Sequence, residues 1–312
     1  MPELIPNRLV FIWIGETLPW SCQLAIKSAI AHCTPQQVIL LHKGLTNNLK
    51  ELTKAMGSDC PEIIEFTLQH FRDLPLSKKL SDELYHNLTK PAALANVLRL
   101  ATLYKEGGIY MDGDTITIAD LKPLRQYRGF CGLEPLALPS QLFQSINPFK
   151  WSAAGIRLAL RELCARWPGG HQLFRNIEPW YFSCVNNAVI GYAPGNPLIA
   201  NACQLIEQMP PLERLKRFRL GTHLLQQVTG NQSTPDMEVL PPDFFYPLGP
   251  EISAQWFRPQ SPAREKIMLS ENTKVVHWYN SVEARFLKRE FNLEFIQENQ
   301  HLPICRLAKP YV

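Results

Sequence analysis

The chain has 312 residues, of which 46% are hydrophobic and 19% charged. This balance is that of an ordinary globular protein and excludes a disordered, collagen-like or coiled-coil chain. A net charge of +4 disfavours a general nucleic-acid binder, but it allows a local basic pocket for phosphates and peripheral contact with an acidic membrane face. No run approaches 18 apolar residues, so no membrane-spanning helix is expected.

The eight cysteines are scattered along the chain and form no CxxC pair. In a chain of this length they indicate reduced, packed thiols rather than a disulfide framework or a zinc site. The first residues, MPELIPNRLVFIWIG, have no charged segment followed by a long apolar one, so no signal peptide is expected. We therefore expect a cytoplasmic protein, or an effector secreted by another route to act in a host cytosol.

The first predicted elements alternate between strand and helix. Residues 8–15 are a compact apolar run that ends at a glycine, as in a buried strand. Residues 24–33 have helical spacing, and 37–44 predict a second strand. Residues 62–71 fit either a third strand or a short helix. A strand–helix–strand opening indicates an α/β sheet with helices on its faces.

The strongest helix prediction covers residues 90–108. Pro91 suits the first turn, and Gly107 and Gly108 end the helix. The next run, IYMDGDTITI, predicts one strand over residues 109–118.

The remaining segments are less regular. We expect residues 135–180, rich in Pro, Trp and Arg, to be irregular and to cover a cleft. Residues 184–209 predict a strand, a turn and a helix, 219–230 another helix, and 273–280 a late strand.

Asp112 and Asp114 lie two residues apart where a buried strand should end. In an extended strand such residues point to the same side. At an effective dielectric of ~20, like charges ~5 Å apart repel by about 3 kcal/mol, and a divalent cation between them reverses this cost. Oxygen ligands suit Mg²⁺ or Mn²⁺, with substrate phosphates completing the coordination. The carboxyl end of such a strand is also where α/β sheets bind ligands. The pattern predicts a metal that holds a diphosphate; a solvated turn is the alternative.

The segment ANVLRLATLYKEGGIYMDGDT resembles the signature of the DXD-containing sugar-transferase family, which includes fungal-type α-mannosyltransferases. It is also similar to the catalytic core of the large clostridial glucosylating toxins. The residues that fall on the pattern are Arg99, Leu103, Tyr104, Gly107, Gly108, Tyr110, Asp112 and Asp114. Weaker similarity extends over IPNRLVFIWIG, NNAVIGYAPGNPLI, GTHLL, FFYPLGP and VVHWYN.

The resemblance implies a GT-A type α/β fold, in which a Rossmann-like nucleotide-binding sheet carries added helices. One catalytic domain would span 1–312, with a nucleotide-binding core over 1–125 and a donor and acceptor half over 126–312. It also implies retaining transfer of a hexose or N-acetylhexosamine from a nucleotide sugar, dependent on Mn²⁺ or Mg²⁺. A UDP-sugar is the favoured donor and GDP-mannose the alternative; the acceptor is a protein, a glycan or a glycolipid.

The same resemblance implies roles for single residues. Trp13 would stack on the nucleotide base, and Arg99 would contact the donor. Asp112 would reach the ribose and, through water, the metal, whereas Asp114 would ligate the metal directly. Each residue also has an ordinary structural interpretation: Trp13 as part of the core, and Arg99 as an ion-paired helix residue.

Further roles fall on the second half of the chain. Asn186 or Asn187 would lie near the donor sugar. His277, a candidate metal or phosphate ligand, and Trp278 would lie on a segment that closes over the diphosphate; a packed core histidine is the alternative. Asn96 stands where the family pattern has aspartate. An amide lacks the charge that strengthens hydrogen bonds to sugar hydroxyls, so the identity of the donor sugar is left open.

Two other functions remain open. YMDGDTITI also resembles the first motif of haloacid-dehalogenase-type phosphatases, with Asp112 as nucleophile, Asp114 as acid and base, and Mg²⁺ between them. That function needs a downstream acidic pair, and no adjacent pair follows residue 114. A sugar-nucleotide-binding pseudoenzyme is indicated only by Asn96.

Overall fold

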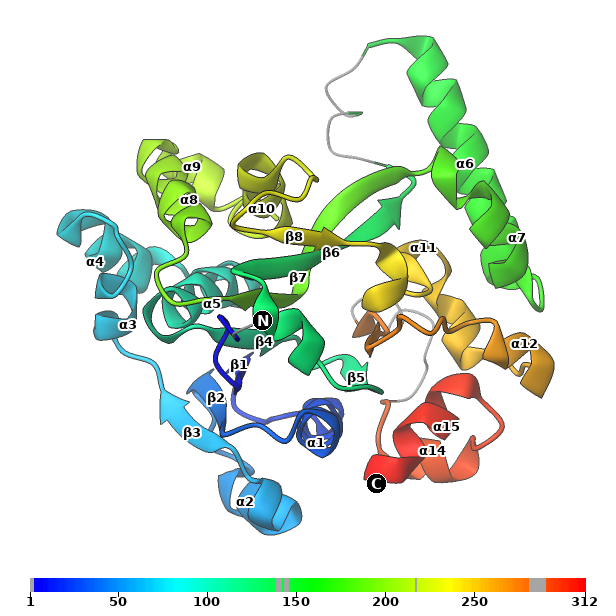
Figure 1. The fold of residues 1–312 in the computed structure, drawn as a ribbon, viewed down its shortest axis with the longest axis horizontal. Coiled ribbons are helices and arrows are strands. Elements are labelled where there is room, and N and C mark those ends of the chain that lie inside the picture. Colours follow the sequence, from blue (N-terminus) through cyan, green and yellow to red (C-terminus); the bar gives the residue numbers. More distant parts are fainter. Residues whose placement is uncertain (1–2, 139–141, 143–145, 217, 281–289) are drawn as a thin grey trace.

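The computed structural model describes residues 3–138, 142, 146–216, 218–280 and 290–312 (Figure 1). A seven-stranded sheet has the order β3-β2-β1-β4-β7-β6-β8. β7 is antiparallel to both its neighbours, β4 and β6, while the other pairs are parallel. The strands are β1 (Arg8–Ile14), β2 (Gln37–Lys43), β3 (Glu62–Glu65), β4 (Gly108–Met111), β6 (Gly129–Leu136), β7 (Phe182–Tyr192) and β8 (Glu238–Leu240).

A second, two-stranded sheet pairs β5 (Thr115–Thr117) with β9 (Val275–His277). The α-helices with assigned bounds are α1 (Trp20–Cys33), α2 (Leu49–Met56), α3 (Leu68–Arg72), α4 (Lys78–Asn87), α5 (Pro91–Glu106), α6 (Pro148–Arg166), α7 (Gly170–Ile177), α8 (Pro197–Gln208), α9 (Pro211–Arg214), α10 (Thr222–Thr229), α11 (Gly249–Ile252), α12 (Pro262–Lys266), α14 (Leu293–Glu298) and α15 (Pro303–Ala308).

The opening elements confirm the predicted α/β class. β1, α1 and β2 lie where the apolar patterns put them. The ambiguous segment 62–71 holds both predicted structures, because β3 is followed by α3. The predicted helix and strand over 184–209 are α8 and β7, and the late strand is β9.

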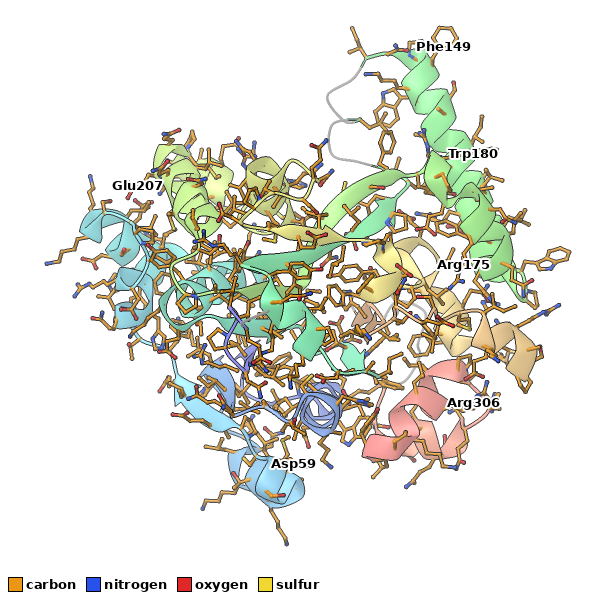
Figure 2. The ribbon with its side chains drawn as sticks, in the orientation of Figure 1. Asp59, Phe149, Arg175, Trp180, Glu207 and Arg306 are labelled. Carbon is orange, nitrogen blue, oxygen red and sulfur yellow. The ribbon has the colours of Figure 1, made fainter. Side chains whose placement is uncertain are left out.

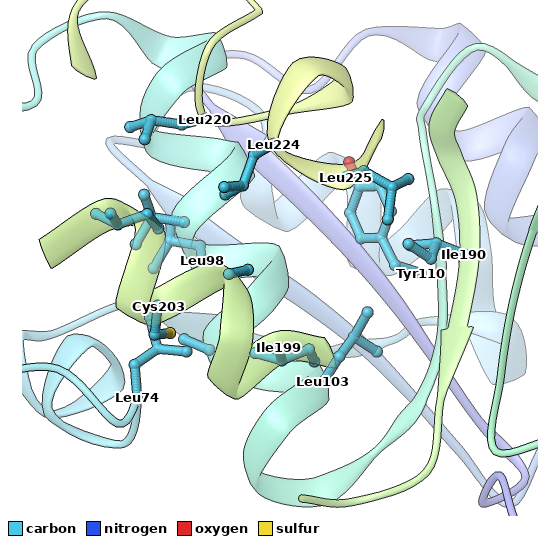
Figure 3. Packing of buried hydrophobic residues seen from close by; sticks show 14 of the residues in the cluster. Leu74, Leu98, Leu103, Tyr110, Ile190, Ile199, Cys203, Leu220, Leu224 and Leu225 are labelled. Atoms are coloured by element: carbon cyan, nitrogen blue, oxygen red, sulfur yellow. The ribbon is translucent and has the colours of Figure 1, made fainter. Parts of the chain in front are cut away.

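Helices cover both faces of the large sheet. Successive residues of β1 point to opposite faces: Val10 packs in the core with α5, α8 and α10, whereas Leu9 and Phe11 pack with α1. Figure 3 shows the first of these cores, where side chains from α5, α8 and α10 meet Tyr110 and Ile190 of the sheet. A third apolar cluster surrounds the two-stranded sheet and the C-terminal helices. All eight cysteines are free, and seven of them are buried.

Two predictions were wrong. Residues 109–118 are not one strand: β4 ends at Met111, the chain turns through Asp112, Gly113 and Asp114, and β5 joins the other sheet. The described part of segment 135–180 is largely helical, since α6 and α7 occupy most of it. Pro148 lies in the first turn of α6 and Pro168 in the connection to α7, so neither interrupts a helix.

The Gly107–Gly108 pair is required by backbone geometry. Both residues have positive φ, +68° and +118°, which L side chains rarely adopt. A Cβ on Gly108 would lie 2.8 Å from the backbone oxygen of Arg8 in β1. The pair therefore lets the chain leave α5 and enter β4 directly beside β1.

We expect Gly108→Ala to lower the free energy of unfolding by about 1–3 kcal/mol, because it adds both backbone strain and a backbone clash. Gly155→Ala in exposed α6 is the matched control. A Cβ there meets nothing within 4 Å, so the change should raise stability by about 0.5–1 kcal/mol. Urea unfolding followed by circular dichroism measures both. Similar values for the two variants would contradict this account of the glycine pair.

Candidate active site

Asp112 and Asp114 occupy the turn between β4 and β5, at the carboxyl edge of the parallel strands. The Asp112 amide donates to the Ala188 carbonyl of β7 at 2.8 Å, and the Thr115 hydroxyl donates to the Asp112 carbonyl at 2.8 Å. Gly113 lies against α1, because a Cβ there would be 2.9 Å from the Cys22 sulfur. The carboxylates thus converge through a tight turn rather than through the alternation of one strand.

His277 completes a three-residue cluster with the two aspartates. One ligand atom from each of the three lies within 4.8 Å of the others. Thr115 of β5 pairs with His277 of β9, and this register brings the histidine next to Asp114. Two carboxylates and an imidazole are a donor set that fits a divalent cation. An imidazole suits a first-row transition metal such as Mn²⁺ better than Mg²⁺, which takes oxygen ligands.

Arg99 and Tyr110 hold Asp112. Arg99 Nη2 donates to Asp112 Oδ1 at 2.9 Å, and the Tyr110 hydroxyl donates to the same oxygen. The guanidinium lies 3.9 Å from the centre of the Tyr110 ring and also donates to the Asn187 carbonyl. Burial raises the pKa of Asp112 above its ordinary value despite Arg99, and Asp114 raises it further. Arg99 is itself 5% exposed, so here it positions Asp112, and its predicted donor contact stays a prediction.

Asp114 is bound on both oxygens. His277 Nε2 lies 3.0 Å from Oδ1, and the Asn280 amide donates to Oδ2 at 2.8 Å. Burial acts to raise the pKa of Asp114, but His277 and these hydrogen bonds lower it below the ordinary value. Burial acts to lower the pKa of His277, yet the nearby carboxylates raise it. The pair is therefore already a charge-assisted contact before any ligand binds.

Glu134 is a buried carboxylate beside this cluster that the sequence analysis missed. Its Oε2 accepts from Asn186 Nδ2 at 2.6 Å and from the Tyr279 hydroxyl at 2.9 Å. The Tyr279 ring lies 4.0 Å from the His277 ring, and its φ of +57° is unusual for a bulky residue. Burial raises the pKa of Glu134. A charged residue inside the apolar strand GFCGLEPL was the available signal.

Asn186 and Asn187 act in different places. Asn186 binds Glu134, whereas Asn187 Nδ2 donates to Asn96 Oδ1 at 3.0 Å. A Cβ on Gly221 would lie 2.7 Å from Asn96 Nδ2, so α10 begins directly against this amide. A cavity of about 20 Å³ lies here, room for about one water. Of the two asparagines, Asn187 is the one beside Arg99 and Asn96.

Trp13 and Trp278 lie in different surroundings. Trp13 is partly exposed near the end of β1, the strand that pairs with β4, and its buried indole nitrogen has no hydrogen-bond partner. Trp278 is fully buried and packs on Phe257 and Phe291. Its amide donates to the Asp114 carbonyl at 3.1 Å. In this structure Trp278 therefore meets the site through its backbone, and the predicted roles of both residues stay predictions.

Comparison with known protein families indicates the enzyme class. Residues 19–130 match the family model described as a glycosyltransferase sugar-binding region containing a DXD motif. Over these residues, which are less than half of its length, the chain is similar to DXD-type glycosyltransferases. The match spans α1 to the start of β6 and includes both aspartates. It confirms the predicted resemblance and the enzyme class, and with the sheet of Figure 1 the GT-A type α/β fold.

Solved structures give more distant likenesses to this glycosyltransferase. GlyE of Streptococcus pneumoniae TIGR4 is 11% identical over 98% of this chain and 60% of its own, with a TM-score of 0.49. The PaToxG glycosyltransferase is 17% identical over 73% of this chain and 70% of its own, with a TM-score of 0.45. The glycosyltransferase domain of the YGT toxin is 11% identical over 99% and 94%, with a TM-score of 0.42. The curated proteins gave no match.

We expect Asp114→Asn and His277→Ala each to weaken Mn²⁺ binding by at least about tenfold, because even the loss of a partner outside the ligand set costs 10–100-fold. Titration followed by electron paramagnetic resonance of free Mn²⁺ measures the affinity without any substrate. Asp82→Asn, on a surface ion pair of α4 with Arg72, is the matched control and should bind Mn²⁺ as the wild type does. Unchanged Mn²⁺ affinity in Asp114→Asn and His277→Ala would contradict a metal site at these residues.

Proposed function

We propose that this glycosyltransferase is metal-dependent and retaining, and that it moves a hexose or N-acetylhexosamine from a nucleotide sugar to a protein, glycan or lipid acceptor. A UDP-sugar is the favoured donor and Mn²⁺ the favoured cation. The observation that carries the proposal is the Asp112–Asp114–His277 cluster, which lies at the edge of the sheet where α/β folds bind nucleotides.

The cation would be held by Asp112, Asp114 and His277, and when bound it neutralises the charge that a nucleoside diphosphate gains as it leaves. The protein's own part is to hold these ligands. Arg99 and Tyr110 hold Asp112 through hydrogen bonds to its Oδ1. The Asn280 amide holds Asp114, and the β5–β9 pairing places His277 beside it. Such preorganised charge needs little rearrangement during the reaction.

Retention is proposed to follow from attack on the face that the leaving group vacates. The acceptor hydroxyl oxygen forms the new bond to the anomeric carbon while the bond from that carbon to the diphosphate oxygen breaks. The electron pair of the broken bond stays on the diphosphate oxygen, and the diphosphate also receives the proton of the acceptor hydroxyl. A double displacement needs a protein nucleophile. Asp112 and Asp114 are committed to the cation, and Glu134 is 7% exposed with two donors on Oε2. Front-face attack therefore suits this site better.

The test is release of nucleoside diphosphate from UDP-glucose, UDP-N-acetylglucosamine, UDP-galactose and GDP-mannose, each with Mn²⁺. Turnover of one donor is expected in the wild type and in Asp82→Asn, and a loss of at least about 100-fold in Asp114→Asn, the scale of removing one charge-stabilising group. Full activity in Asp114→Asn would contradict the proposal. Hydrolysis of p-nitrophenyl phosphate without turnover of any sugar donor would instead favour the phosphatase. Tight donor binding without turnover would favour the pseudoenzyme.

Trp13 provides a separate prediction for the nucleotide. If the indole stacks on the base, Trp13→Ala should weaken binding of the nucleoside diphosphate by about 1–3 kcal/mol, the range for base–aromatic stacking. Isothermal titration in the presence of Mn²⁺ measures this change, and Trp13→Phe should recover part of it. Unchanged affinity in Trp13→Ala would leave this residue with a packing role only.

A further inference from the structure

Helix α6 projects from the sheet, and with α7 it forms one edge of the molecule (Figure 1). Four apolar residues are spaced by seven, seven and four positions along α6 and just past its end: Phe149, Ile156, Leu163 and Trp167. This spacing places them on one helix face, and they are 81%, 62%, 47% and 64% exposed. We call these four residues the outer stripe.

The inner side of α6 has a different environment. Lys150, Ala153 and Arg157, together with Phe149 at the start of the stripe, line a groove of about 570 Å³ against the first residues of β7. Arg157 there stacks on Phe182, with 4.5 Å between its guanidinium and the ring centre. α6 packs on the protein's own core through Leu158 and Cys164. Ile156, Leu163 and Trp167 of the outer stripe are therefore left exposed, while Phe149 also lines the groove.

Exposed apolar side chains concentrate in this part of the chain. Of the 17 large hydrophobic residues classed as exposed among the described residues, nine lie between 146 and 182. All three tryptophans that are well exposed, Trp151, Trp167 and Trp180, are among them; Figure 2 shows Trp180 and Phe149 at the outer edge of the molecule. A concentration of this kind marks a surface that something covers.

The charge of the same segment indicates what covers it. Residues 146–182 contain five basic and two acidic side chains, a net charge of +3 against +4 for the whole chain. These are Lys150, Arg157, Arg161, Arg166 and Arg175, with Glu162 and Glu178. Arg161 pairs with Glu162 and with Glu251 of α11, and Arg166 pairs with Glu162, so Lys150, Arg157 and Arg175 carry the excess positive charge. A second copy of the chain would set this positive segment against itself, and like charges across an interface are costly. The covering surface should therefore be anionic.

We propose that the outer stripe docks on an anionic lipid surface, with α6 lying in the plane of the headgroups. An apolar face of Phe, Ile, Leu and Trp bordered by Lys and Arg is the pattern of helices that lie in a membrane interface, where tryptophan is enriched and basic residues are attracted by acidic lipids. α6 is about 28 Å long at 1.5 Å per residue. No described helix is long and apolar enough to cross a membrane, so this contact is peripheral.

The experiment is co-sedimentation of the full chain with two kinds of vesicle. One is phosphatidylcholine alone, and the other contains about 30% phosphatidylglycerol, an anionic lipid. Binding should require the anionic lipid and weaken at high salt. The double variant Ile156→Glu, Leu163→Glu should bind at least about tenfold more weakly, because it places two carboxylates in the apolar face. Leu212→Glu, at a residue of α9 that is 79% exposed, is the matched control and should bind as the wild type does. Unchanged thermal unfolding shows that the variants are folded.

Several outcomes would overturn the proposal: no binding, equal binding to pure phosphatidylcholine, or equal losses in the stripe variant and Leu212→Glu. Light scattering gives the remaining alternative. A dimer that the stripe variant converts to monomers, without vesicle binding by the wild type, would make the stripe an interface between copies. Membrane binding does not depend on catalysis, and Asp114→Asn should bind vesicles as the wild type does. A failure of the membrane proposal can therefore be told apart from a failure of the transferase function.

Discussion

The pairing of β5 with β9 is the contact on which the rest of the site depends. It sets Thr115 opposite His277 and so joins two residues, Asp114 and His277, that are 163 positions apart in the chain. The same pairing brings the Asn280 amide to the second oxygen of Asp114. Without it, the turn after β4 would hold two neighbouring carboxylates with repelling charges and no third ligand. With it, the turn places two carboxylates and an imidazole together, a donor set that fits the divalent cation and the diphosphate site proposed above.

Two buried networks lie beside the aspartates and His277. On one side, Arg99 lies between the Tyr110 ring and Asp112 and reaches the Asn187 carbonyl. On the other, Glu134 accepts from Asn186 and Tyr279. The second network accounts for the positive φ of Tyr279, since a strained backbone persists only where its surroundings fix it. β7 connects the two networks because it carries both asparagines. The geometry of this candidate site therefore depends on β7 of the large sheet as well as on the DxD turn.

The sequence predicted best what depends on neighbouring residues. β1, α1, β2 and α5 follow local apolar patterns, and Gly107–Gly108 and the aspartates lie in one short segment. The sequence-based prediction failed where contacts between residues far apart in the chain determine the structure. Nothing within IYMDGDTITI shows that β5 leaves the large sheet, because its partner β9 is far along the chain. Prolines and tryptophans made the sequence of α6 and α7 look irregular, although Pro148 and Pro168 lie outside the helix interiors. Glu134 was missed because its partners come from β7 and from the segment after β9.

We propose above that Asp112, Asp114 and His277 bind a nucleoside diphosphate through a divalent cation. Thermal unfolding of the purified chain with UDP, GDP, CDP and ADP, each with and without Mn²⁺, tests it most directly. Ligand at 100 times its dissociation constant should stabilise the fold by about 2.7 kcal/mol. We expect one nucleotide, with UDP favoured, to raise the unfolding temperature only when Mn²⁺ is present, and Asp114→Asn to remove this increase. Stabilisation by none of the four nucleotides with Mn²⁺, or the same increase in Asp114→Asn, would contradict it.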